Sequence, residues 1–435
     1  AGYWQLVVGS VTYPSATTGW DNPPVRIYSS SWTEGWPTED TDNTAENIFS
    51  LTETDVNTGV FEYTTGQLST LSNGQVAVGD TLYVQYIDPA NDAGTEETVS
   101  GTALITVNSA INNNRGGITF NPNDGTLDIN AAITAQDFIA LYGDTAIQLA
   151  ANLTANDNNI TVDDDLTLDG GTPTITATSG DVTFSANVDG AQALTVNSAN
   201  GTTTFGAGVG GTSRVSSLTV SAATASLGGN IYTADGNVDF TDTEAVTLTV
   251  GVTIDTEAGD DGNAGYIKFK PTGTINGAQT LSIDASTTGA FTGGAVQLGI
   301  IGNTTALTSL TVANTGGTTD GTTTLYGNIT TTGAITMTDA DDINLAGNVK
   351  MTTTNSDVVL GGDAADTVDG SYTLTIDAGT GDVKLPIVGG TTALAGLSVT
   401  DSGTIDMLAA VTAEGDIYVK ADNASAAALD ADAAI

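Results

Sequence analysis

The feature that most constrains the fold is an internal repeat, because short stretches of sequence recur in the same order along the chain. One stretch reads "VDGAQALTV" around Gly190, "TINGAQTLSI" around Gly277 and "VDGSYTLTI" around Gly370. These glycines lie 277 − 190 = 87 and 370 − 277 = 93 residues apart. A segment restated at this period predicts a repeat architecture, in which each copy packs on its neighbours.

Two further stretches follow the same period. One reads "TSRVSSLTV", "TTALTSLTV" and "TTALAGLSV" and begins at Thr212, Thr304 and Thr391, so its copies are 304 − 212 = 92 and 391 − 304 = 87 residues apart. The other begins at Asn152, Asn230, Asn328 and Ala410. Three stretches that recur in one order are not explained by chance similarity.

Within each copy, the apolar residues form short alternating pairs such as Leu194 with Val196. A strand this short buries one or two side chains, so single coils must stack to make a core. Gly, Asn and Asp fill the intervals, which suits corners. The pattern predicts a parallel β-helix (β-solenoid) with Leu and Val inside and Thr or Asn outside. At roughly 20–25 residues per coil it would have about 13–16 coils and a length of about 60–75 Å. The alternative, an array of antiparallel sandwiches, would need longer strands and more aromatic residues.

The first 107 residues have a different composition. They hold all four tryptophans and five of the nine prolines, and their short β-rich runs alternate with turn signals about every ten residues. This spacing predicts a small antiparallel, Ig-like β-sandwich. We therefore expect an all-β chain of two domains, a β-sandwich over residues 1–107 and a parallel β-helix of repeats over residues 108–435.

Both regions resemble known families. The stretches "LTETDVNTGVFE" (51–62) and "VGDTLYVQYIDP" (78–89) resemble a β-sandwich module of prokaryotic surface (S-layer-like) proteins. The repeats, with "GAQ" before an alternating pair and "VGG" before the next, are similar to those of filamentous-haemagglutinin-type adhesins and autotransporter passenger domains. These resemblances imply a β-sandwich, a parallel β-helix and a structural role at a cell surface.

The net charge of −43 comes from 51 acidic and only 8 basic residues. So negative a chain repels phosphates and anionic lipids, which argues against a nucleic-acid partner. The absence of Cys and His excludes disulfides, thiolate metal sites and a histidine base. No apolar run has the length of a membrane span, and the chain begins at Ala1 without a signal-peptide pattern. We expect an extracellular or cell-surface protein in its mature form.

Clusters of carboxylates are the candidates for chemistry. They are residues 163–165, residues 339–342, Asp260 with Asp261, and in the first region Glu53, Asp55, Asp88 and Asp92. A pair of carboxylates across a cleft could cleave a polysaccharide, but Asp is also favoured at turns, and no cluster of basic residues stands ready to hold a polyuronate. We expect no catalytic residues and no enzyme activity. Calcium, which binds carboxylate oxygens, is the one expected cofactor, at the four acids of the first region.

The ends of the sequence predict self-assembly. A solenoid normally needs a polar cap at each end, yet the repeat that begins at Ala410 continues to Ile435. At the other end, "YWQLVVGSVTY" is strongly β-forming and could add as a strand to a neighbouring subunit. Its alternative role is the first strand of the sandwich. A head-to-tail contact that does not close gives a homopolymer. The predicted contact residues are Tyr3, Trp4, Leu6, Val8, Val11, Tyr13, Val411, Ile417, Val419 and Ile435.

Together these expectations describe a structural extracellular protein, a subunit of a surface fibre, filament or sheath. The alternatives are a carbohydrate-binding or carbohydrate-cleaving β-helix protein and a stalk segment of a single-chain adhesin. A line of exposed aromatics would favour the carbohydrate alternative, and the candidates are Tyr232, Tyr266, Tyr326, Tyr372 and Tyr418. Glycosylation is left open by six N-x-S/T sequons, at Asn152, Asn159, Asn200, Asn303, Asn328 and Asn423.

Overall fold

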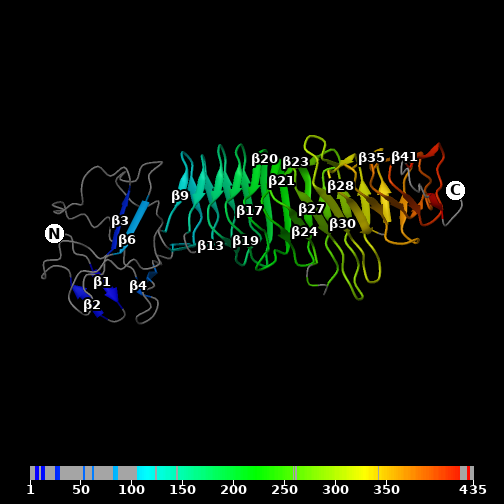
Figure 1. Ribbon diagram of the computed structural model, residues 1–435. Helices are drawn as coiled ribbons and strands as arrows, with labels where there is room; N and C mark the ends of the chain where they lie inside the picture. Colours follow the sequence, from blue (N-terminus) through cyan, green and yellow to red (C-terminus); the bar gives the residue numbers. More distant parts are fainter. Residues whose placement is uncertain are drawn as a thin grey trace.

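The chain forms a long solenoid of short strands. The computed structural model describes residues 105–122, 125–143, 146–257, 259, 262–340 and 342–421, and the backbone of seven further strands. Over residues 105–419 the chain is a parallel β-solenoid of about 14 turns (Figure 1). At about 4.8 Å per turn this corresponds to a rod of roughly 65–70 Å. The predicted all-β fold and the predicted parallel β-helix are thereby confirmed.

In the first 104 residues the structure describes only the backbone of six short strands. They form three antiparallel pairs, β1(Gln5–Val8) with β2(Val11–Pro14), β3(Val25–Ser29) with β6(Leu82–Tyr86), and β4(Thr52–Glu53) with β5(Phe61–Glu62). Most of the predicted β-sandwich falls outside the described residues, and the sandwich stays a prediction.

Each coil of the solenoid contributes strands to three faces that follow the rod. The first face consists of β7(Ile105–Val107), β10(Thr126–Ile129), β13(Ala146–Leu149), β16(Leu166–Leu168), β19(Val188–Asp189), a single-residue bridge at Val209, β22(Ile231–Tyr232), β24(Val252–Asp255), β27(Thr280–Asp284), β30(Ser309–Ala313), β33(Ile335–Asp339), β36(Val358–Leu360), β39(Val383–Leu385), β42(Ile405–Met407) and β44(Leu429–Ala431).

The second face begins with β8(Ile111–Asn113), β11(Ile133–Ala135), β14(Leu153–Ala155), β17(Thr174–Ala177) and the first halves of β20(Ala193–Phe205), β21(Ser217–Leu227) and β23(Val238–Leu248). It continues through β25(Ile267–Phe269), β28(Val296–Leu298), β31(Thr322–Leu325), β34(Asp342–Leu345), β37(Thr367–Asp369) and β40(Ile387–Val388).

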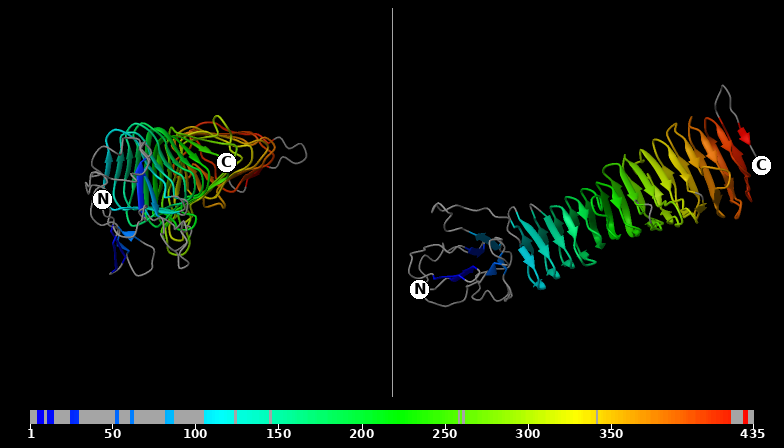
Figure 2. Two further views of the ribbon diagram at one scale, coloured as in Figure 1. Left: turned by 90° about the vertical axis from the view of Figure 1, so that its left-hand side faces the viewer. Right: turned by 90° about the horizontal axis from the view of Figure 1, so that it is seen from below.

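The third face begins with β9(Ile118–Phe120), β12(Ile139–Leu141), β15(Ile160–Val162), β18(Val182–Phe184) and the second halves of β20, β21 and β23. It continues through β26(Thr274–Asn276), β29(Ile300–Ile301), β32(Ile329–Thr330), β35(Val349–Thr352), β38(Thr373–Asp377), β41(Gly396–Asp401) and β43(Ile417–Val419). Figure 2 shows the coils along the rod and from its N-terminal end.

The interior of the rod consists of columns of apolar side chains. Burial alternates along the strands because successive side chains point to opposite sides of the backbone. Leu127 of β10 lies in register with Ile147 of β13, and both are fully buried. On the third face, the rings of Phe184 and Phe205 stack with centroids 5.1 Å apart and 7° between their planes. Each buried Leu, Ile or Phe contributes about 1.5–3 kcal/mol, so these columns stabilise the rod along its whole length.

Coil length varies more than the sequence indicated. Ile147 pairs with Leu166, a coil of 166 − 147 = 19 residues, whereas Val252 pairs with Leu281, a coil of 281 − 252 = 29 residues. The longest coils carry loops at the corner between the first and second faces, after β24, β27 and β30 (Figure 1). A corner tolerates such insertions because they leave the strands on either side in register.

The sequence repeat corresponds to eleven strand segments and not to a whole number of coils. From β27 to β38 the difference is 38 − 27 = 11 segments. Eleven segments also lead from the first half of β20 to β27, with each half of β20, β21 and β23 and the bridge at Val209 counted separately. Since a coil has three segments, one repeat covers 11/3 coils, or three and two-thirds.

The copies of the repeat are therefore rotated around the rod. The alternating pair that follows the repeated glycine lies in β20 on the second face, in β27 on the first face and in β38 on the third face. The stretch that begins at Thr212, Thr304 and Thr391 makes the same shift, because its strands are β21, β30 and β41. The same repeated sequence therefore lies on a different face of the rod in each copy.

Candidate functional site

The repeated glycines stand at corners where the backbones of two coils approach each other. Gly190, Gly277 and Gly370 have φ angles of 117°, 132° and 128°. A Cβ on any of the three would lie 2.4 Å from the carbonyl oxygen of a leucine in the preceding coil. Both the left-handed backbone and the close approach require glycine. This explains why the glycine recurs on every face.

The residue before each glycine joins its corner to a turn of the next coil. The Oδ1 atom of Asp189 accepts hydrogen bonds from the backbone N–H groups of Thr212, at 2.8 Å, and Ser213, at 3.0 Å. Asn276 and Asp369 accept the same two bonds in their copies, at 2.8–3.2 Å. These turns begin at glycines with φ near 70°, which are Gly210, Gly302 and Gly389. We define a repeated corner as this carboxylate or amide, its glycine and the turn that it holds.

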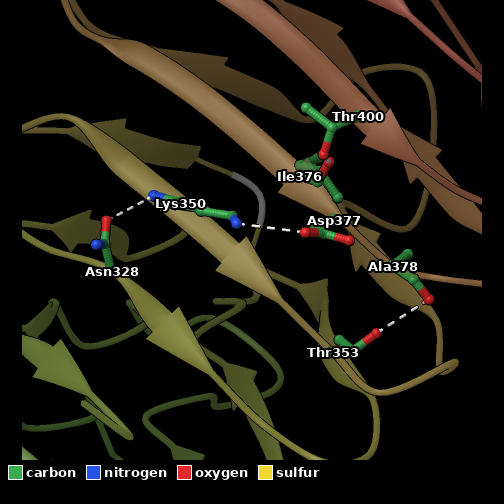
Figure 3. Close-up of polar contacts among 7 residues, drawn as sticks. All are labelled: Asn328, Lys350, Thr353, Ile376, Asp377, Ala378 and Thr400. Atoms are coloured by element: carbon green, nitrogen blue, oxygen red, sulfur yellow. Dashed lines mark hydrogen bonds and ion pairs between the residues drawn. The ribbon is translucent and has the colours of Figure 1, made fainter.

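Polar side chains outside the corners also join coil to coil (Figure 3). Asn328 accepts a hydrogen bond from the backbone N–H of Lys350 at 2.9 Å, and the Nζ atom of Lys350 reaches Asp377 at 3.3 Å. Thr400 donates its hydroxyl to the carbonyl oxygen of Ile376 at 3.1 Å. The bonds of Asn152 to Thr174 and of Asn230 to Thr253 repeat the asparagine arrangement. Apart from the contact of Lys350 with Asp377, each of these bonds pairs a backbone group of one coil with a side chain of a neighbouring coil.

The acidic run at residues 163–165 has the same structural use. Asp163 accepts a hydrogen bond from the Ser185 hydroxyl, and Asp165 accepts two from Asn187, all at 3.0–3.1 Å. Asp164 reaches back to the preceding coil, where it accepts a bond from the N–H of Gly143 at 2.8 Å. Three adjacent carboxylates therefore hold three coils together. Of the residues 339–342, Asp342 accepts a bond from the Thr367 hydroxyl.

The remaining candidate metal ligands fall outside the described side chains. These are Asp260, Asp261, Asp339, Asp341, Glu53, Asp55, Asp88 and Asp92, of which Glu53 is placed in the backbone of β4 and Asp339 in that of β33. Within the residues that the structure does describe, no three acidic side chains gather as metal ligands. The expected calcium site in the first region stays a prediction.

The five tyrosines do not form one line. Tyr232 is in β22 on the first face, Tyr266 precedes β25 on the second, and Tyr418 is in β43 on the third. Tyr372 and Tyr418 are 41% and 53% exposed. Tyr266 donates a hydrogen bond to Asp239 at 2.9 Å, with the Nζ atom of Lys268 over its ring. Burial, followed by this bond to Asp239, raises the pKa of Tyr266. These contacts indicate that Tyr266 stabilises the outer surface of the rod.

The predicted assembly residues are described in part. Val411 is buried and forms a bridge with Val388, and Ile417 and Val419 lie half-buried in β43, which pairs with β41. Of the others, Leu6, Val8, Val11 and Tyr13 are placed only in the backbone of β1 and β2, and Tyr3, Trp4 and Ile435 lie outside the described residues.

Sequence reasoning missed two groups of residues. It assigned Asp189, Asn276 and Asp369 no role, although their position before a repeated glycine is the signal that marks them. It also assigned no role to Ser198 and Thr203, which lie on either side of the corner inside β20. Thr203 is fully buried, and its hydroxyl lies 2.7 Å from that of Ser198. At this corner β20 bends while its pairing with β21 continues on both sides. These two polar residues of the bend point inward, which the sequence does not reveal.

Comparison of the chain with family models, with curated proteins and with solved structures found no match. The resemblance to surface adhesins therefore rests on the quoted motifs and on the solenoid. In the described part of the chain, no helix is long and apolar enough to cross a membrane.

Proposed function

We propose that the protein is a structural, non-enzymatic subunit of an extracellular fibre, filament or sheath. The observation that carries this proposal is the rotation of the repeat. Each copy keeps its glycine, its capping Asp or Asn and its inward apolar pair, although each copy faces a different direction. Repeated sites that engage one extended partner together would need to face one side of the rod. A repeat that serves only packing has no such need.

The use of the carboxylates supports the same proposal. The acids at residues 163–165, at Asp189 and at Asp369 are occupied by hydrogen bonds between coils. A glycosidase pair would instead face a cleft across a sugar. The scattered tyrosines give no support to a carbohydrate-binding line. The charge of −43 repels other acidic surfaces, and calcium is proposed as the cation that reduces this repulsion, with a site at the four acids of the first region.

Head-to-tail assembly is proposed from the geometry of the stack. Each coil offers the next one a ladder of backbone hydrogen bonds and, behind each of its three faces, stacked apolar side chains. A coil of one copy can stack on a coil of another through the same contacts, and a contact that does not close gives a filament. The proposed contact residues are the ten named in the sequence analysis.

Light scattering on the full chain tests this proposal. We expect the weight-average mass to rise with protein concentration, and a variant without residues 1–13 to stay at the mass of one chain. A full chain that stays monomeric at all concentrations would contradict the fibre and would favour a stalk segment of a single-chain adhesin.

A further inference from the structure

One sequon of the rod differs from the other described ones in its surroundings. Asn303 lies in the turn of a repeated corner, directly after Gly302, whose φ is 68°. Its side chain is exposed and makes no hydrogen bond within the described residues. Thr304 and Thr305, which complete the sequon, are also exposed and belong to no strand. The acceptor amide and the hydroxyl that a transferase must recognise are thus both at the surface.

Three other sequons are built into the strand ladders. Asn152, Asn159 and Asn328 each use the Oδ1 atom to accept a backbone N–H of the next coil, at 2.8–2.9 Å. The middle residue of each sequon is a fully buried aliphatic of the core, and these are Leu153, Ile160 and Ile329. A transferase could bend these segments into its active site only after a coil had opened.

The sequon at Asn200 is held within a strand as well. Its Nδ2 atom donates to the carbonyl oxygen of Thr178 at 3.2 Å, and Thr202 donates its N–H to Asp181 at 2.7 Å. Both ends of this sequon are therefore tied to the neighbouring coil. The backbone N–H groups of Thr304 and Thr305 are likewise held, by Asn276. What sets Asn303 apart among the described sequons is its acceptor side chain, which is exposed and makes no hydrogen bond within the described residues.

We propose that Asn303 is the N-glycan acceptor of the rod. In this reaction the Nδ2 atom of Asn303 attacks C1 of a saccharide carried on a lipid diphosphate. The new N–C1 bond forms as the C1–O bond to the diphosphate breaks, the lipid diphosphate leaves with the electron pair, and Nδ2 loses one proton to a base. The inference rests on the proposed extracellular location, because only an exported chain meets such donors.

The other two copies of the repeated corner allow a matched variant in which a new sequon is introduced at the same position of the turn. The position of Asn303 is occupied by Gly211 and Gly390 in the other two copies, which lie on the other two edges of the rod. A Cβ at Gly211 would meet nothing within 4 Å. The substitution Gly211→Asn, followed by Thr212 and Ser213, therefore adds a sequon at an open turn.

The test uses the purified full chain, made without glycosylation and carrying Asn423→Gln. It is incubated with a single-subunit oligosaccharyltransferase of N-x-S/T specificity and a lipid-linked oligosaccharide, and site occupancy is followed by peptide mass spectrometry. We expect Asn303 to be modified at least about tenfold faster than Asn152, Asn159, Asn200 or Asn328, since those four require local opening first. The variant Asn303→Gln removes this fast site, and Gly211→Asn adds a second one.

Modification of any of the other four asparagines as fast as Asn303 would overturn the proposal. So would a folded Gly211→Asn variant, checked by circular dichroism, that gains no modification. Because the assay needs neither a filament nor a cell, failure of assembly in light scattering would leave this result unaffected, and equal labelling here would leave the fibre proposal standing.

Discussion

Alternate residues of one strand have opposite roles in the rod. In β20, Leu194 is 1% exposed and lies in register with Leu218, whereas the next residue, Thr195, points outward and lies in register with Thr219. The side chains inside are apolar and stacked, and those outside are small and polar. The two neighbours therefore form a natural pair for testing where the stability of the rod arises.

We expect Leu194→Asp to destabilise the protein by more than about 4 kcal/mol, because it buries an unpaired charge. Thr195→Asp, which places the same side chain outside, should cost less than about 1 kcal/mol. Denaturant unfolding of both variants measures the difference. Equal losses of stability would be inconsistent with the alternation of inside and outside.

A second prediction concerns the buried hydroxyl pair. Thr203→Ala should cost about 1–3 kcal/mol, because it leaves the Ser198 hydroxyl buried without a partner. Replacing both residues, as Ser198→Ala with Thr203→Val, should restore most of that loss, since no polar group is then left unpaired. The same unfolding measurement decides the matter, and a double variant less stable than Thr203→Ala would show that the pair is not coupled in this way.

The sequence predicts well which apolar residues point into the rod, but it predicts poorly which polar residues do so. Leu194 and Val196 are recognisable because they alternate with Thr. The text "NSANGTTTF" that follows looks like an exposed turn, yet Ser198 and Thr203 both point inward. They can do so because each satisfies the other at 2.7 Å, a contact that only the fold creates.

At the scale of the element, the corners decide how one strand passes to the next. Gly210 has a φ of 72°, and a Cβ there would lie 2.1 Å from the carbonyl oxygen of Tyr232. Gly211, the next residue, has open space around it. Of these two adjacent glycines, Gly210 is therefore required by its surroundings and Gly211 is not.

We expect Gly210→Ala to destabilise the rod by about 1–3 kcal/mol or more, because the backbone conformation is strained for Ala and the carbonyl group must move. Gly211→Ala should be neutral or stabilising by up to about 1 kcal/mol, through lower entropy of the unfolded chain. Melting temperatures of the two variants check this. A Gly211→Ala variant that melts as low as Gly210→Ala would argue against the close approach at Gly210.

The sequence identified these corners but not their orientation. The repeated glycines are visible as text, and their spacing gives the period. The rotation is not visible, because it depends on how many strands make a coil, and the long strands β20, β21 and β23 each supply two faces without a break in sequence. The hydrogen bonds of Asp189, Asn276 and Asp369 to the next coil could have been inferred from the sequence, because each of these residues directly precedes a repeated glycine.

At the scale of the whole molecule, charge sets the conditions under which the rod is stable. A net charge of −43 with only 8 basic residues makes the rod repel itself and its copies. We expect calcium to raise the melting temperature of the full chain more than sodium at matched ionic strength, because a site bound in the folded state adds to screening. The control carries Glu53→Gln and Asp55→Asn and should respond equally to both salts. Equal responses of the unchanged chain would eliminate the specific site.

The most direct test of the structural role is electron microscopy of the purified full chain over a range of concentrations. We expect filaments one rod wide whose length grows with concentration, in which each copy contributes a solenoid of roughly 65–70 Å. Separate rods, each the length of one chain at every concentration, would contradict it.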